Sequence, residues 1–268
     1  MGYLCGRILN LIENKMNELE ELKIFCRQLA DESGKIIRNY WRNNVVVETK
    51  KDLSPVTVAD KKSEELMRQM IMKNYPSHGI LGEEFGEYNP GAEYQWVLDP
   101  IDGTKSFVCG TVTFGTLIAL MKNGEPVLGV INQPVLNEFL IGDGITSELN
   151  GKKVSVRQCS QLSDAVLLTT DQLNIEQHRD IKKFDELVHK VKMYRQWGDC
   201  YGYYLVATGY ADIMLDPIMN PWDLLSLIPI IRGAGGNITD YKGGDPVKGD
   251  SIIATSGTIH QEVIRLLN

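Results

Sequence analysis

The chain has 268 residues, with 28 Lys and Arg against 35 Asp and Glu, so its formal net charge is −7. Its 43% hydrophobic and 24% charged residues exclude disordered and fibrous classes and are typical of an enzyme-sized globular protein. A nucleic-acid partner is not expected, because phosphate backbones are bound by broad cationic surfaces. The apolar stretches are too short to cross a membrane and the N-terminus does not resemble a signal peptide, so we expect no membrane partner and a cytoplasmic location.

Cysteine and histidine spacings argue against two common kinds of site. The five cysteines are odd in number and form no CxxC pair, and the four histidines form no HExxH motif. Neither a disulfide framework nor a zinc site is therefore indicated. Any metal ion in this protein is expected to be held by oxygen atoms.

The first part of the chain is predicted to form helices followed by a mostly antiparallel sheet. We interpret residues 1–15 as an appendage and residues 16–150 as an N-terminal α+β lobe. Apolar positions between Leu22 and Tyr40 keep the spacing of an amphipathic helix, and a second helix is predicted from Ser54-Pro55 and Thr57 to Tyr75. The predicted strands are Trp96–Leu98, Thr113–Met121, Pro126–Asn132 and Glu138–Gly142.

After Asn150-Gly151 the pattern changes to alternating strands and helices, which favours an α/β lobe over residues 151–268. The predicted strands are Ala165–Thr169, Ala211–Leu215, Asn237–Asp240 and Ser251–Thr255. The predicted helices are Glu176–Val191, one that includes Tyr203–Thr208, Leu224–Arg232 and a last one from Thr258. The two lobes together predict a layered protein with both α+β and α/β character.

The segment from Trp96 to Thr104 is the most informative one for function. An apolar strand leads directly into Asp99 and Asp102, and Pro100 and Gly103 favour a turn that brings both carboxylates and a backbone carbonyl together. Such a turn is suited to hold a cation. The alternative is a surface turn in which an aspartate caps the next helix.

Two further acidic segments have the same ambiguity. Glu83 and Glu84 lie between glycines after an apolar pair, and Asp223 precedes an apolar helix that Gly235-Gly236 follows. Each could be a solvated acid or a helix cap. If all these acids converge, their mutual repulsion requires a cation, and hard oxygen ligands favour Mg²⁺ or Mn²⁺.

An acidic metal centre suits the hydrolysis of phosphate esters. The metal neutralises an anionic substrate that bare carboxylates would repel, and it activates a water molecule for in-line attack. Gly103 and Thr104 begin the following segment, and their backbone N–H groups are predicted to bind the phosphate oxygens.

These residues resemble the inositol monophosphatase superfamily. Its two signatures are matched by Asp99-Pro100-Ile101-Asp102-Gly103-Thr104 and by Trp222-Asp223 with the glycines that follow the next helix. Gly82-Glu83-Glu84 and Thr57–Asp60 precede them in the expected order, from about Met16 to the C-terminus. The resemblance implies a layered αβαβα sandwich, a homodimer and sensitivity to Li⁺.

The resemblance also implies roles for individual residues. Glu83, Asp99 and the carbonyl of Ile101 would hold one Mg²⁺, and Asp99, Asp102 and Asp223 would hold a second, with two or three ions per site and Mn²⁺ as a possible substitute. Glu83 would also act in catalysis. Thr104, backed by Asp60, would orient and deprotonate the attacking water, although Asp60 is also placed to form a capping box with Thr57.

Within the superfamily, Arg195–Tyr203 and Asp216–Asp223 are more similar to the histidinol-phosphate phosphatase branch. The predicted substrate-binding residues are Asp102, Arg195, Gly198, Asp199 and Asp216. Asp199 and Asp216 would pair with the cationic end of L-histidinol phosphate, a small phosphorylated metabolite of histidine biosynthesis; otherwise Asp199 caps a helix and Asp216 only ends a strand. The alternatives are an inositol-1-monophosphatase, a broad-specificity phosphatase or a non-catalytic cation-binding protein.

Overall fold

The computed structural model describes residues 2–43, 47–49 and 55–268. The helices are α1 (Gly2–Tyr40), α2 (Val58–Asn74), α3 (Thr104–Val108), α4 (Gln172–His178), α5 (Ile181–Lys190), α6 (Asp199–Ala207), α7 (Pro221–Leu224), α8 (Leu227–Gly233) and α9 (His260–Leu267). The strands are β1 (Val47–Thr49), β2 (Pro55–Thr57), β3 (Gly79–Gly82), β4 (Gly86–Tyr88), β5 (Tyr94–Asp102), β6 (Gly115–Lys122), β7 (Glu125–Gln133), β8 (Glu138–Gly142), β9 (Ser147–Leu149), β10 (Lys152–Val154), β11 (Val166–Thr169), β12 (Met193–Arg195), β13 (Ile213–Asp216), β14 (Asn237–Thr239) and β15 (Ile252–Thr255).

Within the described part of the chain, the strands form a large sheet, a smaller sheet and a short hairpin. The eight-stranded sheet has the order β10-β9-β8-β7-β6-β5-β3-β4 in those described residues, and its neighbours are antiparallel except for β3 and β5. The predicted antiparallel sheet is therefore confirmed. The predicted boundary at Asn150-Gly151 falls in the turn between β9 and β10, two strands that pair with each other.

The smaller sheet comes from the second part of the chain and has the order β12-β11-β13-β15-β14. Strand β11 pairs in parallel with both β12 and β13, whereas β15 is antiparallel to β13 and β14. The α/β character predicted for this region thus applies to one half of the sheet, because parallel neighbours need the helical crossovers that α4 to α6 supply.

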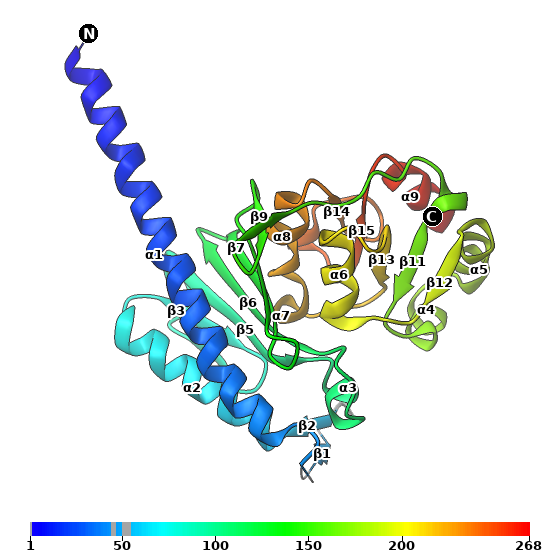
Figure 1. Cartoon of the computed structure of the whole chain (residues 1–268), viewed down its shortest axis with the longest axis horizontal. Coiled ribbons are helices and arrows are strands. Elements are labelled where there is room, and N and C mark those ends of the chain that lie inside the picture. Colours follow the sequence, from blue (N-terminus) through cyan, green and yellow to red (C-terminus); the bar gives the residue numbers. More distant parts are fainter. Residues whose placement is uncertain (1, 44–46, 50–54) are drawn as a thin grey trace.

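Alternating side chains make both faces of the large sheet apolar, so both faces must be covered. Trp96 and Leu98 of β5 pack with α1 and α2, whereas Val97 packs on the opposite side with α6 and α8. The smaller sheet packs one face on that same middle helical layer and the other on α4, α5 and α9. Figure 1 shows the resulting order of helices, sheet, helices, sheet and helices. The predicted αβαβα sandwich is confirmed.

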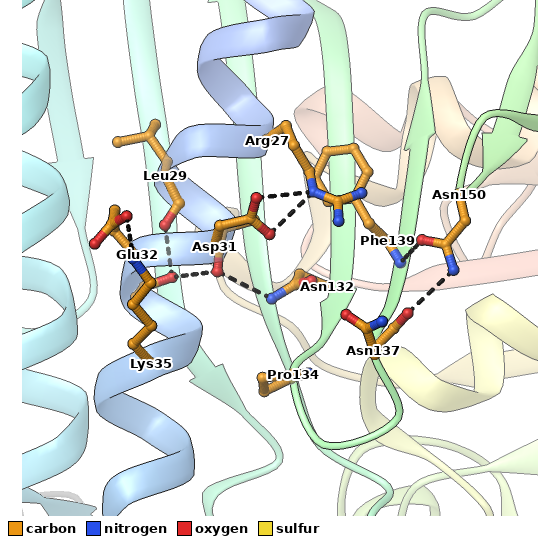
Figure 2. A network of polar contacts seen from close by, with 12 residues as sticks. Arg27, Leu29, Asp31, Glu32, Lys35, Asn132, Pro134, Asn137, Phe139 and Asn150 are labelled. Carbon is orange, nitrogen blue, oxygen red and sulfur yellow. Dashed lines mark hydrogen bonds and ion pairs between the residues drawn. The ribbon is translucent and has the colours of Figure 1, made fainter.

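Helix α1 is fixed to the large sheet by polar contacts as well as by its apolar face. Asn132 Nδ2 on β7 donates to the carbonyl of Ala30 at 3.3 Å. The Arg27 guanidinium binds Asp31 at 3.0 Å and lies over the Phe139 ring, 4.9 Å from its centroid. Figure 2 shows Arg27 and Asp31 of the helix on the side of Asn132 and Phe139. These contacts fix the helix on the sheet along its C-terminal half.

Helix α1 begins well before Leu22, where the predicted amphipathic pattern starts. Apart from Met1, which lies outside the described residues, residues 1–15 continue the same helix as residues 22–40. Figure 1 shows this part extending away from the two sheets. Among the described helices, none combines the length and the apolar character that a membrane span needs.

Several predicted elements have different limits. The helix predicted at Glu176–Val191 is divided into α4 and α5, because the Asp180 side chain accepts the N–H of Lys182 and starts a new helix. The helix predicted at Leu224–Arg232 is likewise divided into α7 and α8. Strand β5 does not end at Leu98 but continues to Asp102. Thr57 is the N-cap of α2 as predicted, while Ser54 lies outside the described residues.

Candidate active site

Two carboxylates of the site come from the irregular end of β5. The pairing of β5 with β6 shifts register between Asp99 and Asp102, and the N–H of Ile101 donates to Asp99 Oδ1 at 3.0 Å. The next residue, Gly103, has a φ of 82°, which turns the chain sharply into α3. The turn expected near Pro100 is therefore a bulge within the strand followed by a left-handed glycine.

Asp223 joins these two acids from the middle helical layer. It is the third residue of α7, and its Oδ2 accepts the backbone N–H of Asn220 at 2.8 Å. One carboxylate oxygen each from Asp99, Asp102 and Asp223 lies within 4.8 Å of the other two. Asp223 therefore caps its helix and also completes an acidic cluster that could hold a metal ion.

Glu83 reaches the same cluster from the loop between β3 and β4. Its backbone N–H donates to the carbonyl of Leu98 at 3.1 Å, which places this loop beside the end of β5. Its negative charge contributes to the raised pKa of both Asp99 and Asp223. Four acids from three segments of the chain are thus brought together.

The raised pKa values of the aspartates in this cluster show that their ionised forms are destabilised when no cation is bound. Burial, followed by the charges of Glu83, Asp102 and Asp223, raises the pKa of Asp99 well above its ordinary value. Burial and the charges of Asp199 and Asp223 do the same for Asp102, and burial raises the pKa of Asp223 to about 7. Buried carboxylates that repel one another are stabilised in their ionised form by a divalent cation, so the donor set fits a hard metal ion.

Asp60 uses its two carboxylate oxygens for different contacts. Oδ2 accepts the backbone N–H of Thr57 at 2.8 Å and its hydroxyl at 2.5 Å, which is the capping box. Oδ1 lies 3.5 Å from Thr104 Oγ1, and that hydroxyl lies 3.1 Å from the carbonyl oxygen of Ile101. Burial raises the pKa of Asp60 to about 6. The two roles considered for Asp60 are therefore compatible in one geometry.

A pocket of about 370 Å³ opens beside these groups. Its described lining includes the acids Glu83, Asp102, Asp171, Asp199, Asp216 and Asp223, the basic residue Lys105, and the polar residues Thr104, Ser106, Thr170 and Asn174. Six lining acids against one lysine among these described residues make the pocket strongly acidic. Cluster and pocket together can therefore hold cations and a substrate that tolerates or prefers negative surroundings.

Asp199 lines the pocket beside the turn that follows β5, and the backbone N–H of the next residue, Cys200, donates to Asp102 Oδ2. Asp199 has a φ of 51°, its backbone N–H donates to Thr170 Oγ1 at 2.8 Å, and Ser106 Oγ donates to its Oδ2 at 3.2 Å. A Cβ at Gly103 would lie 2.8 Å from the same Oδ2, so the glycine allows the two segments to approach. Burial raises the pKa of Asp199 to about 6. This aspartate is the first residue of α6, yet it also lines the pocket.

Asp216 ends β13 and is nearly buried at 6% exposure. The Tyr203 hydroxyl donates to its Oδ2 at 2.9 Å, and the N–H of Thr170 points at its Oδ1 at 3.4 Å. Burial raises its pKa to about 7. The carboxylate lines the pocket and is held in a fixed orientation by these two donors.

Two residues predicted to bind substrate are placed elsewhere. Arg195 is exposed on β12, where its guanidinium bonds the carbonyl of Tyr194 at 2.7 Å, and it is absent from the described pocket lining. Gly198 is buried against Thr170, whose Cα would lie 2.1 Å from a Cβ at that position. A direct substrate contact by Arg195 is therefore not supported, and Gly198 serves close packing.

The lining residues that follow β11 were not among those predicted from the sequence. Thr170, Asp171 and Asn174 lie at the end of this strand and in the start of α4. The available signal was positional, because ligands in α/β sheets bind beyond the carboxyl ends of parallel strands. Applying that rule to the predicted strand Ala165–Thr169 would have found them.

Comparison with known proteins agrees with this geometry. The model of the inositol monophosphatase family matches residues 18–268. The chloroplastic bifunctional phosphatase IMPL2 of Arabidopsis thaliana is 45% identical over 229 residues, a match that covers 84% of this chain and 66% of that relative. This chain thus spans slightly less than two thirds of that protein. The histidinol-phosphatase of Chlorobaculum parvum is 37% identical, with 88% of this chain and 93% of the relative covered.

Solved structures show the same fold. An inositol monophosphatase from Zymomonas mobilis has a TM-score of 0.83 and 35% identity, covering 92% of this chain and 98% of its own. An IMPase of Thermotoga maritima has a TM-score of 0.84 and 29% identity, with 92% and 97% covered. The chain therefore belongs to the inositol monophosphatase family, a family of phosphatases.

Proposed function

We propose that this protein is a Mg²⁺-dependent phosphomonoesterase that hydrolyses L-histidinol phosphate to L-histidinol and phosphate. The observation that carries the proposal is the convergence of Asp99, Asp102 and Asp223 within 4.8 Å beside an acidic pocket. A surface turn or an isolated helix cap would not bring these residues together from separate segments. The raised pKa of the acids supports a cation as part of the working site.

Mg²⁺ would be held by the residues of the acidic cluster. Glu83, Asp99 and the carbonyl of Ile101 provide one set of oxygen donors, and Asp99, Asp102 and Asp223 provide another. When bound, the metal supplies charge neutralisation for the phosphate and lowers the pKa of water. Mn²⁺ has a similar preference for oxygen ligands and is expected to substitute.

Thr104 and Asp60 are placed to handle the proton of the attacking water. The Thr104 hydroxyl lies 3.5 Å from Asp60 Oδ1, and Asp60 Oδ2 is engaged by the N-cap of α2. The same hydroxyl lies 3.1 Å from the Ile101 carbonyl, so its proton must turn from that oxygen to Asp60 when Thr104 accepts a hydrogen bond from water. Asp60, whose pKa is about 6, suits a base near neutral pH. Glu83, beside Asp99, would share in holding the water in place.

The phosphate is expected to bind at the start of α3. Gly103 turns the chain with a φ of 82°, and Thr104 begins the helix. Backbone N–H groups in the first turn of a helix lack partners within the helix and are suited to phosphate oxygens. The adjoining acids would repel the phosphate unless the metal were bound, so phosphate and metal binding depend on each other.

The acids beyond the metal cluster favour a cationic leaving group. Asp171, Asp199 and Asp216 line the pocket in addition to the cluster, whereas Lys105 is the basic residue among the described lining. Histidinol phosphate carries an ammonium and an imidazole beside its phosphate, and such groups form charge-assisted hydrogen bonds with carboxylates. An inositol ring offers only hydroxyl groups and would leave these buried charges unbalanced.

The names of the relatives support both this substrate and a rival one. Histidinol-phosphatases from Chlorobaculum parvum and Mycobacterium tuberculosis are 37% and 36% identical, whereas fructose-1,6-bisphosphatase/inositol-1-monophosphatases from Aquifex aeolicus and Thermotoga maritima are both 29% identical. The additional acids Asp171, Asp199 and Asp216 in the pocket favour the first group. A homodimer and Li⁺ sensitivity are expectations from the family resemblance, and a cytoplasmic location is an expectation from the sequence.

Phosphate release from a substrate panel tests the proposal. Histidinol phosphate, inositol 1-phosphate, fructose 1,6-bisphosphate and adenosine 3′,5′-bisphosphate are each assayed with Mg²⁺ and with EDTA. We expect kcat/KM for histidinol phosphate to exceed the others at least tenfold and all turnover to stop with EDTA. A higher value for inositol phosphate would transfer the assignment to the rival, and turnover that persists in EDTA would contradict metal dependence.

A further inference from the structure

A buried carboxylate on α2 lies directly beneath the loop that carries Glu83. Glu64 is 0% exposed, and its Oε2 accepts the backbone N–H of Glu84 at 2.7 Å. Its Oε1 accepts the N–H of Phe85 at 3.2 Å. Charged acceptors form the stronger class of hydrogen bond, and these two fix the backbone immediately after Glu83.

Arg68, one helical turn further along α2, binds the other end of the same loop. Its Nη1 lies 3.3 Å from Glu64 Oε1 and donates to the carbonyl of Gly86 at 2.9 Å. The charge of Glu64 is thereby balanced, and the segment from Glu84 to Gly86 is tied to one turn of a helix that packs firmly in the core through Met67 and Ile71.

The Glu83 loop lies so close to α2 that only glycine fits at position 82. A Cβ at Gly82 would lie 1.9 Å from Glu64 Oε1 and 2.4 Å from its Cδ. The Glu64 carboxylate therefore occupies the space above Gly82, and the residues on both sides of Glu83 are set by it. Such a contact is specific to position 82, since the neighbouring loop glycine, Gly86, has no atom within 4 Å of an added Cβ.

We propose that Glu64 is a positioning residue that sets the affinity of the site for divalent cation by holding the Glu83 loop in its binding geometry. The inference depends on the proposed function only in assigning Glu83 as a metal ligand. A ligand on a loop that must be ordered on binding loses affinity, and groups that support metal ligands commonly change affinity 10- to 100-fold. Glu64 touches neither metal nor substrate, so its effect passes through the backbone.

Glu64→Gln tests this with little change in shape, because the amide keeps one oxygen but cannot accept the second N–H. Glu65→Gln is the matched control, since Glu65 is the next residue of α2 and is exposed. Mg²⁺ binding to the metal-free full-length protein is measured by titration calorimetry. We expect Kd to rise about tenfold in Glu64→Gln and less than twofold in Glu65→Gln.

Two more readouts separate positioning from a general loss of stability. Hydrogen exchange of the Glu84 and Phe85 amides should be at least about tenfold faster in Glu64→Gln, while the melting temperature of the metal-free protein reports on the whole fold. At saturating Mg²⁺, kcat should return to within twofold of the parent, because the loop is then held by the metal. An unchanged Kd alongside faster exchange would overturn the proposal, as would a kcat that saturating Mg²⁺ does not restore.

A second variant keeps the test decisive if Glu64→Gln does not fold. Arg68→Gln removes the bond to Gly86 and leaves Glu64 in place, so Kd for Mg²⁺ should rise about threefold, and no rise would contradict the proposal. Metal binding is measured without substrate. Absence of phosphatase activity in the parent would therefore refute the proposed reaction but leave this result interpretable.

Discussion

The pocket has two walls, one that carries the acidic metal cluster and one that carries Asp171, Asp199 and Asp216, and they differ in how the sequence supplies them. The metal wall takes Asp99 and Asp102 from four consecutive residues of one strand end, and its chemistry is visible in the sequence. The opposite wall combines the end of β11, the start of α6 and the end of β13, which are joined by the smaller sheet and by the hydrogen bonds of Thr170 and Tyr203. Half of the metal wall is therefore visible in one short sequence motif, while Glu83 and Asp223 join it from two other segments. The opposite wall has no such motif, because each of its three segments contributes a single acid to the pocket.

The largest effect is expected when the central acid of the metal wall is removed. Asp99→Asn should lower kcat at least about 10³-fold, because this carboxylate is shared by both proposed sets of metal ligands. The melting temperature of the metal-free protein should not fall, since one of several repelling charges is removed. Phosphate release with increasing Mg²⁺ measures the effect. The exposed Asp164→Asn serves as control, and a comparable loss there would contradict the assignment.

Thr104 tests the catalytic part of the same wall. Thr104→Val keeps the shape but removes the hydroxyl near Asp60, and kcat should fall about 10²-fold, within the range of proton-transfer catalysis. Thr104→Ser retains the hydroxyl and should lose much less. The Mg²⁺ affinity from titration calorimetry should stay the same in both variants. Equal activities of the Val and Ser variants would show that the hydroxyl is not used.

The opposite wall should affect substrate choice more than chemistry. Asp216→Ala should lower kcat/KM for histidinol phosphate about tenfold or more, because a charge-assisted hydrogen bond is lost, while inositol phosphate changes less than threefold. Tyr203→Phe, which removes the donor to Asp216 but keeps its charge, should cause a smaller shift in the same direction. An equal loss for both substrates would indicate that this wall does not discriminate between them.

A last prediction, which touches neither wall, concerns the dependence of stability on pH. Burial lowers the pKa of His260 to about 4, and its ring contacts the hydroxyls of Thr239 and Thr255 at 3.0 and 2.9 Å. The unfolded chain therefore binds the proton first, so this histidine makes stability fall as pH drops from 6.5 towards 4. The loss is about 2 kcal/mol after solvent screening.

The raised pKa values of Asp99 and Asp102 act with the opposite sign. In the metal-free protein they make stability fall as pH rises above their ordinary value near 4, until the raised pKa is passed. Urea unfolding between pH 4 and 8 measures both slopes. His260→Gln should flatten the acid slope, whereas the exposed His189→Gln should not, and identical slopes would contradict the assignment.

Most of the architecture could be predicted because apolar periodicity reports directly on burial. The sequence pattern predicted the strands of the large sheet from β5 to β8 and helix α2. Each of these elements packs against other regular elements, so its apolar residues recur at the spacing of a strand or a helix. The division of Glu176–Val191 was missed because one cap at Asp180 outweighs a continuous apolar stripe. Short edge strands such as β4 and β12 carry too few residues for a pattern.

The part of the candidate site that could be predicted is the one whose residues form a short and unusual sequence motif. Two acids with a proline and a glycine between and after them indicated a turn with oxygen donors, and the structure brings Asp99 and Asp102 together as expected. Glu64 could not be found, because a glutamate on a helix with polar neighbours looks like a solvated one. Its burial depends on the loop that folds over it, which only the tertiary structure shows.

Asp60 and Asp223 occupy the same position, the third residue, in α2 and α7, and each accepts the N–H of the residue that caps its helix. The first turns of these helices therefore cannot fray without displacing a carboxylate from the site. Because helix ends open at lower free energy than the core, heat should inactivate the protein before it unfolds globally. The temperature of inactivation would then measure the stability of the first turns of α2 and α7 and not that of the whole αβαβα fold.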